Sequence, residues 1–154
     1  MTKEPDIQNS LIKKFGFLEG KIRIPRERRI FADAAPENFA TIIEYAMKDL
    51  SFTMLCTITG LDEGATLGFL YHLAREDGIM LSIKLNIDKN NPVIKTITGY
   101  FPGADIYERE LMDLLGAKVE GLPEGRRYPL SDDWPVGDYP LRKDWKKQEG
   151  ANNA

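Results

Sequence analysis

Three carboxylates lie close together in the chain, at Glu108, Glu110 and Asp113. Paired carboxylates can act as general acid and base, and a small hydrolase built on this set is one hypothesis. Glu108 and Asp113 do not share a helical face with Glu110, however, and Arg109 lies among them. Four further cations follow: Arg126, Arg127, Arg142 and Lys143. Because the arginine fork suits carboxylates, we interpret the set as an ionic latch, which either fixes the C-terminal segment after residue 116 to the rest of the chain or pairs with another polypeptide.

The chain has one cysteine, Cys56, and one histidine, His72. Iron–sulfur clusters and structural zinc sites need about four thiolate or imidazole ligands. With one cysteine, this chain alone cannot supply the thiolates. A Cys–His nucleophilic pair is formally conceivable. Cys56 falls in an alternating apolar pattern with Phe52, Met54 and Ile58, which predicts a buried structural thiol. No Ser or Asp spacing supports a catalytic role for His72, so we expect a surface or partly hydrogen-bonded imidazole.

The glycines Gly60, Gly64 and Gly68 invite comparison with a phosphate-binding loop. The Gly-Lys-Ser/Thr ending of such a loop is missing, and Gly68 lies within a strand pattern rather than at the start of a helix. The spacing therefore favours an ordinary turn.

A basic segment near the N-terminus could bind nucleic acid, acidic lipid or an acidic partner subunit. The alternative interpretation is a solvated edge strand whose charges prevent pairing with other chains. The net charge of −3 argues against general nucleic-acid binding, although a free-standing nucleic-acid-binding module remains the alternative function. The cations concerned are Lys21, Arg23, Arg26, Arg28 and Arg29.

Composition indicates an ordinary water-soluble domain. The 154 residues include 42% hydrophobic and 29% charged side chains, enough for one core. No apolar run approaches the roughly 18 residues of a membrane span, and the first ten residues do not resemble a signal peptide. We expect the chain in the cytoplasm unless a partner holds it at a membrane.

Hydrophobic periodicity predicts the scaffold. Helices are expected over residues 5–15 and 36–50, and from Asp105 to a stop at Gly116. Asp105 and Glu108 have the spacing of a capping box. Strands are expected at 21–24 and 28–32, both as short edge strands, and at 52–59, 67–73, 79–87 and 93–98. The predicted fold class is α+β, with an antiparallel sheet and helices packed on one face.

The chain after residue 116 has a different character. It contains four prolines, no sustained period, and several aromatic residues, including Trp134, Tyr139 and Trp145. Irregular segments of this length are uncommon in compact domains, and this one is too aromatic for a solvated tail. Residues 1–116 are therefore predicted as the α+β domain, and residues 117–154 as an extended C-terminal arm that docks on partner subunits or folds back on the domain.

The strings EREL, RRYPL, DDWP and YPLRKDW occur in this order between residues 108 and 145. They resemble the signature of the 30 kDa subunit family of respiratory complex I, the NADH dehydrogenase. That family includes the matching subunit of membrane-bound, energy-converting nickel-iron hydrogenases and of formate hydrogenlyase. The residues of the last two strings, DDWP and YPLRKDW, together with the short chain, favour the hydrogenase branch of this family.

This resemblance implies a non-catalytic structural and assembly subunit in the hydrophilic arm of a membrane-bound, ion-translocating oxidoreductase. The implied partners are the catalytic large subunit, with a nickel-iron or quinone site, and the small iron–sulfur subunit. The nickel-iron centre and iron–sulfur clusters would belong to those partners, with no cofactor, metal or catalytic residue on this chain. The implied location is the cytoplasmic side of the membrane, and the membrane arm is contacted only indirectly. Residues expected at the interface with these partners are Glu108, Arg109, Glu110, Asp113, Arg126, Arg127, Trp134, Tyr139, Pro140, Leu141, Arg142, Lys143 and Asp144.

Overall fold

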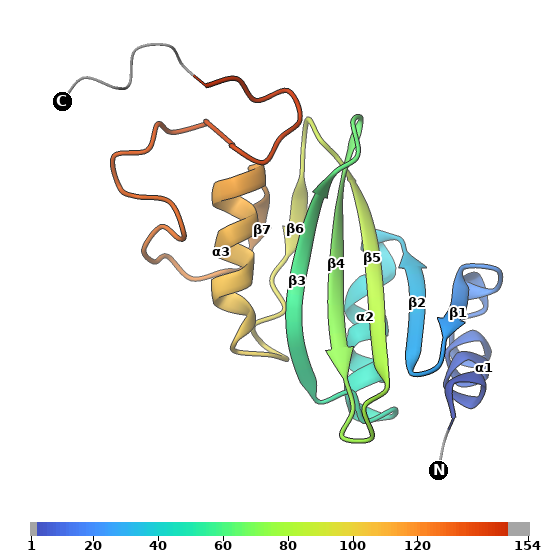
Figure 1. Cartoon of the computed structure of the whole chain (residues 1–154). Coiled ribbons are helices and arrows are strands. Elements are labelled where there is room, and N and C mark those ends of the chain that lie inside the picture. The colour runs from blue at the N-terminus through green and yellow to red at the C-terminus, as the bar shows by residue number, and fades with distance from the viewer. Residues whose placement is uncertain (1–2, 148–154) are drawn as a thin grey trace.

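The computed structural model describes residues 3–147, and Figure 1 shows the elements in chain order. The predicted helices and strands are confirmed in order, and a short 3-10 helix and strand β7 are additional. Residues 148–154 of the predicted arm lie outside the described residues. The bounds are α1 Glu4–Lys14, η1 Gly16–Leu18, β1 Ile22–Arg26, β2 Arg29–Ala34, α2 Pro36–Lys48, β3 Met54–Asp62, β4 Thr66–Ala74, β5 Met80–Asp88, β6 Val93–Lys95, α3 Ala104–Leu115 and β7 Lys118–Glu120.

Five strands form one sheet in the order β1-β2-β5-β4-β3. Three neighbouring pairs are antiparallel, whereas β2 runs parallel to β5, with Arg29 opposite Met80. The prediction of two edge strands is therefore wrong for β2, which lies inside the sheet. It is correct for β1, where Pro25 lacks the N–H that an inner strand would need. The parallel pair is possible because a crossover containing α2 follows β2.

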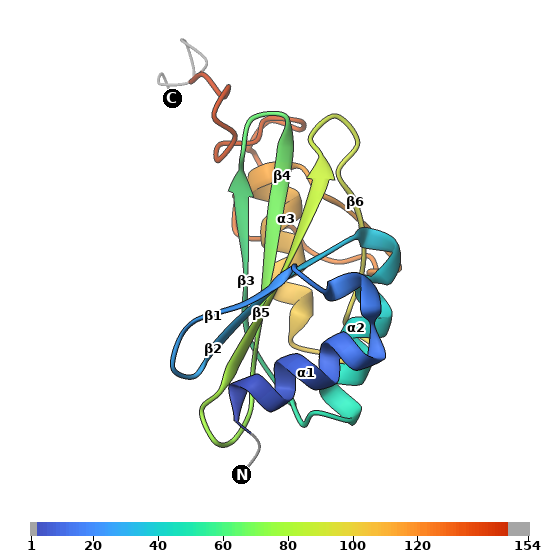
Figure 2. The same ribbon diagram turned by 90° about the vertical axis from the view of Figure 1, so that its right-hand side faces the viewer.

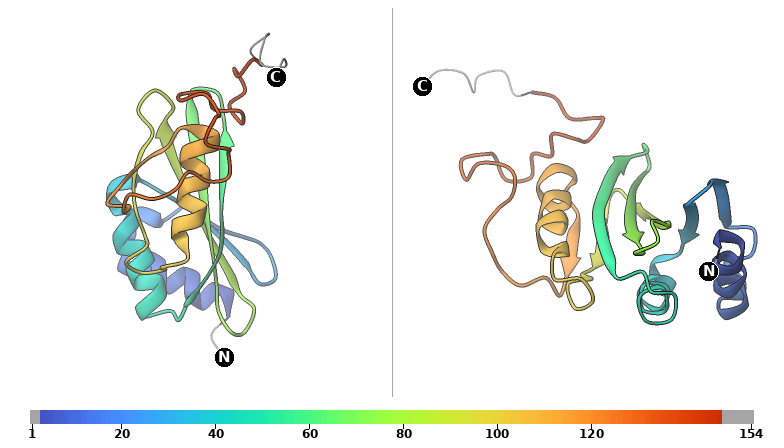
Figure 3. Two further views of the ribbon diagram at one scale, coloured as in Figure 1. Left: turned by 90° about the vertical axis from the view of Figure 1, so that its left-hand side faces the viewer. Right: turned by 60° about the horizontal axis from the view of Figure 1, so that its bottom comes forward.

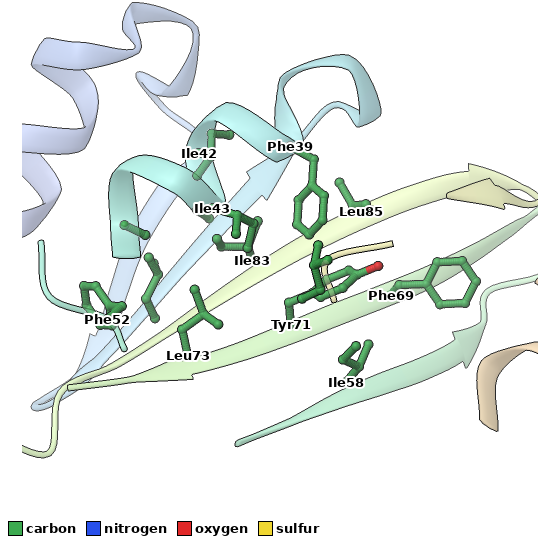
Figure 4. Packing of buried hydrophobic residues seen from close by; sticks show 14 of the residues in the cluster. Phe39, Ile42, Ile43, Phe52, Ile58, Phe69, Tyr71, Leu73, Ile83 and Leu85 are labelled. Carbon is green, nitrogen blue, oxygen red and sulfur yellow. The ribbon is translucent and has the colours of Figure 1, made fainter. Parts of the chain in front are cut away.

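The core lies between the sheet and its helices. α2 crosses one face of the sheet, where Phe39 meets the ring of Tyr71 at 4.4 Å between centroids (Figure 4). α1 packs on β1 and β2 (Figure 2), with Ile7 and Leu11 fully buried. The predicted alternation in β4 is confirmed, since Leu67, Phe69, Tyr71 and Leu73 are all fully buried.

Strand β3 departs from its predicted pattern at a bulge. The register with β4 shifts between Leu55 and Thr57, so Cys56 is the extra residue. The shift turns Met54 outward, where it is 57% exposed, and leaves Cys56 only partly buried. The prediction of a buried thiol is therefore wrong, because a bulge ends the alternation on which that prediction depended.

The last elements form a second layer beside β3. β6 and β7 make a separate two-stranded parallel sheet, and α3 stands against β3 (Figure 1). Gly60 allows this contact, because a Cβ there would lie 2.3 Å from Leu115 Cδ1. The segment after β7, residues 121–147, has no helix or strand in the described range. It crosses α3 and returns over the end of that helix (Figure 3), and we call it the arm.

Candidate functional site

Helix α3 is the element on which most of the predicted contact residues depend. It ends, as predicted, at Gly116 in the left-handed conformation with φ +77°. Gly116 has no Cβ, which also leaves room for the arm, because a Cβ there would lie 2.5 Å from the ring of Tyr139. The glycine therefore both ends the helix and seats the arm.

The predicted capping box at the start of α3 is wrong. The N-cap is Gly103, without a side-chain cap bond. Asp105 instead pairs with Arg109 one turn later, at 2.8 Å between Oδ1 and Nε. Arg109 also donates to the carbonyl of Pro123 at 2.7 Å, so this pair connects the helix to the beginning of the arm.

Glu108 points into the protein rather than into an ionic latch. Its side chain is fully buried and accepts hydrogen bonds from Thr96 Oγ1 at 2.6 Å and from the Ile97 backbone N–H at 2.8 Å. Burial raises the pKa of Glu108 above its ordinary range, and these two hydrogen bonds oppose the shift. The sequence contained a pattern that indicates the burial of Glu108, because this residue shares one helical stripe with Ala104, Leu111 and Leu115. Glu108 thus fixes α3 to the segment after β6.

The ionic latch forms at Asp113 instead. Asp113 Oδ1 accepts a hydrogen bond from Arg127 Nε at 2.9 Å, and Oδ2 accepts one from the Leu130 backbone at 3.0 Å. Arg127 also donates to the carbonyl of Trp134 at 2.6 Å. Glu108, Glu110 and Asp113 do not converge, since Glu110 lines a groove beside β3, so the geometry gives the hydrolase hypothesis no paired carboxylates.

The arm closes over the C-terminal end of α3. Arg142 Nε donates to the carbonyl of Leu115 at 2.7 Å, and the Leu141 backbone donates to Leu114 at 3.1 Å. These bonds satisfy carbonyls that the helix leaves without partners, and the cation suits the negative end of the helix dipole. The Arg142 guanidinium also lies over the Tyr139 ring, 4.8 Å from its centroid.

Beyond this point the arm is held by contacts among its own aromatic residues. Trp134 and Trp145 stack with centroids 6.4 Å apart. Both indole N–H groups donate to Asp138, one to its carbonyl and one to its carboxylate. The two tryptophans therefore pack on each other within this chain. Of the predicted contact residues between them in the sequence, Pro140 is partly buried and Leu141 is 55% exposed.

A buried aspartate at the end of β3 anchors the last described part of the arm. Asp62 Oδ2 accepts hydrogen bonds from Lys89 Nζ and from the Lys143 backbone, each at 2.8 Å. Lys89 also pairs with Asp144 at 3.0 Å. The hydrogen bond from Lys89 holds the pKa of Asp62 well below its usual range. Sequence reasoning missed Asp62 and Lys89, because neither lies in a motif and their partners are distant in the chain.

His72 lies on the sheet face opposite the helices. Its ring nitrogens contact Thr59 Oγ1 at 3.1 Å and Ser82 Oγ at 2.8 Å, and burial lowers the pKa of His72. Of the three glycines compared with a phosphate loop, Gly64 occupies the β3–β4 turn with φ +96°, whereas Gly60 and Gly68 lie within strands. Neither feature forms a catalytic arrangement in the described residues.

Within residues 3–147, no group of three His, Cys, Asp or Glu side chains is arranged to hold a metal ion. None of the helices in this range has the length and apolar character of a membrane span.

A family model described as "Respiratory-chain NADH dehydrogenase, 30 Kd subunit" matches residues 32–150. The chain belongs to this family. The match includes α3 and the arm, so both are features of the 30 Kd subunit family and not an addition to it.

Two curated relatives and one solved structure place the chain within the family. It is 30% identical to the membrane-bound hydrogenase subunit beta of Pyrococcus furiosus, over 100% of this chain and 94% of that protein. It is 41% identical to the formate hydrogenlyase subunit 5 of Escherichia coli, over 48% of this chain but only 13% of that protein. A chain in the structure of the membrane-bound sulfane sulfur reductase, an archaeal respiratory membrane complex, superposes with a TM-score of 0.81 at 25% identity, covering 92% of this chain and 85% of that chain.

Proposed function

We propose that this chain is a non-catalytic structural subunit of a membrane-bound oxidoreductase of the complex I and energy-converting hydrogenase type. The observation that carries the proposal is the similarity to the membrane-bound hydrogenase subunit beta, which extends over this whole chain and nearly all of that protein. The similarity to a chain of an archaeal respiratory membrane complex supports it independently, through the fold.

The arrangement of polar groups supports a structural role. Glu108, Asp113 and Arg142, which could have served chemistry or binding, join α3 to the segment after β6 and to the arm. The chain therefore has the character of a brace, in which an irregular arm is fixed to a rigid sheet at a few points. Electrons in such an assembly would pass through a nickel-iron centre and iron–sulfur clusters held by neighbouring subunits.

The formate hydrogenlyase relative indicates which partner to expect. The aligned region makes up 13% of that protein, so most of its polypeptide is a different, larger part joined covalently to a region like this one. We infer that a polypeptide equivalent to that larger part is the main partner here, with the iron–sulfur subunit next to it. The complex would hold this chain on the cytoplasmic side of the membrane.

The test is an affinity purification of the tagged chain from detergent-solubilised native membranes. The eluate is analysed for partner masses, iron and nickel. Two or more stoichiometric partners together with iron support the proposal, and nickel assigns the complex to the hydrogenase branch. A metal-free monomer would contradict it, and the same preparation is then tested for salt-dependent RNA or DNA binding, which the alternative use of the Lys21 to Arg29 segment requires.

A further inference from the structure

A groove lies between the N-terminal half of α3 and the first part of the arm. It has a volume of about 980 Å³ and is lined by Pro102 and Ile106 on the α3 side and by Pro123, Tyr128 and Leu130 on the arm. Figure 1 shows the arm bending away from α3 at this place before it returns to the end of the helix. We call this feature the arm groove.

The walls of the arm groove expose apolar side chains. Ile106 is 46% exposed and Tyr128 is 42% exposed, although both line one concave site. Most of the other large apolar side chains of the chain are in the core. Exposed apolar and aromatic groups in a concave site are typical of the pockets that receive anchor residues of a partner.

The backbone of the arm beside the groove has hydrogen-bonding groups to offer. Within the described part of the chain, residues 122–128 take part in no backbone–backbone hydrogen bond. The segment is held at its ends by side chains, through Arg109 to Pro123 and through Arg127 to Asp113. An irregular segment held open in this way can pair its N–H and C=O groups with an extended segment of another protein.

The charges at the groove define what would complement it. Arg109 and Arg127 are paired with carboxylates of α3. Arg126, Glu124 and Asp132 also line the groove, and no ion pair involves them among residues 3–147. An occupant that matches this wall presents a carboxylate to Arg126 and a cation to the two acids, beside an apolar side chain between Ile106 and Tyr128.

We propose that the arm groove is the docking site for an extended segment of the larger partner polypeptide, with one apolar side chain inserted between Ile106 and Tyr128. This inference rests on the proposed function for the identity of the partner. The covalent joining of a like region to a larger polypeptide in the formate hydrogenlyase relative favours this partner over a second copy of the chain.

The test compares two exposed apolar residues in the intact complex. Tagged wild-type, Ile106→Asp and Met54→Asp chains are expressed in the native cells, and the co-purified larger polypeptide is quantified. Met54 is 57% exposed and lies at the start of β3, outside the groove, so it serves as the matched control. We expect at least a tenfold loss for Ile106→Asp and a yield within twofold of wild type for Met54→Asp.

A second measurement addresses the arm directly. The Arg126–Arg127 bond lies in an exposed irregular segment, and we expect trypsin to cleave it in the free chain. We expect at least a tenfold slower cleavage at this bond in the purified wild-type complex, and comparable cleavage of the free wild-type and Ile106→Asp chains.

The outcomes separate the two proposals. If the wild-type chain brings down no larger polypeptide, the proposed function fails. If wild type brings it down and Ile106→Asp does so equally well, or if both variants lose it equally, docking in the arm groove is overturned. Unchanged trypsin cleavage in the complex would also overturn it.

Discussion

The sheet and the arm are held in place by different forces. The sheet and its helices bury nearly thirty apolar side chains in one cluster, so its stability is distributed over many contacts. The arm is attached through a few polar anchors at Asp113, Leu115 and Asp62. The stability of the core is therefore sensitive to substitutions that leave cavities. The attachment of the arm is sensitive to the charge of a few groups, and so to pH. The comparison predicts that the arm can be released while the sheet stays folded.

The largest expected effect is a cavity in the core. Phe69 is fully buried between the sheet and the helices, and Phe69→Ala should lower the free energy of unfolding by about 3–5 kcal/mol. Urea denaturation followed by far-UV circular dichroism measures the change. A loss below about 1 kcal/mol would show that the core repacks easily, and the contrast with the arm would then disappear.

Removal of the Asp113 latch should detach the arm and leave the sheet folded. Arg127→Ala leaves a largely buried carboxylate without its guanidinium, a change that costs about 1–3 kcal/mol. Both tryptophans of the chain lie in the arm, so acrylamide quenching of their fluorescence reports its release. The matched control is Arg126→Ala, at a neighbouring arginine that lines the groove, which should leave quenching unchanged. Equal quenching of the two variants would show that the latch does not hold the arm.

Acid should release the arm before it unfolds the sheet. Hydrogen bonds from Lys89 lower the pKa values of Asp62 and Asp144 in the folded protein. A carboxylate with a lowered folded pKa contributes its full stability above the unfolded value of about 3.9. That contribution declines progressively as the pH falls below the unfolded value towards the lower folded value.

Tryptophan fluorescence and circular dichroism, recorded from about pH 5 to about pH 2, measure this acid release separately for the arm and the sheet. Asp62→Asn should flatten the fluorescence transition. Coincident changes of the two signals in the wild-type chain would mean that arm and sheet unfold as one unit.

The smallest effect is expected for a surface ion pair on the sheet. The Arg23 and Asp33 side chains are 61% and 44% exposed, and solvent screens their attraction. Arg23→Ala should therefore change the free energy of unfolding by less than about 0.5 kcal/mol. A larger loss in thermal denaturation would show that the sheet, too, depends on individual charges.

The same contrast explains what the sequence could predict. The alternation in β4 and β5 and the helical stripe of α2 are local patterns, and the structure confirms them. The fold class and the family followed from patterns of this kind and from the charged motif. The bulge at Cys56 and the position of β2 inside the sheet depend on pairing with other strands. Hydrophobic periodicity within one segment gives no information about such pairing.

The anchors of the arm were only partly predictable. Asp113 and Arg127 were among the carboxylates and cations expected to form a latch, but the sequence did not indicate which of them would pair. Glu108 was expected to pair with arginine, yet it is buried against Thr96. Asp62 was not identified, since an aspartate at the end of β3 and the backbone of Lys143 share no local pattern. That the predicted interface residues touch other polypeptides remains a prediction.

The parallel pairing of β2 with β5 affects which strand edges are exposed while the chain is being synthesised. Strand β2 pairs with β5, where Arg29 lies opposite Met80. Because β5 is synthesised later, the hairpin of β1 and β2 leaves the ribosome with the β2 edge unpaired. Bare strand edges are templates for pairing with other chains. A chain shortened by its first 34 residues would keep the β5 edge open permanently, and we expect it to aggregate. In the folded protein β2 covers the β5 edge, so the N-terminal segment prevents the self-association that we expect of the shortened chain.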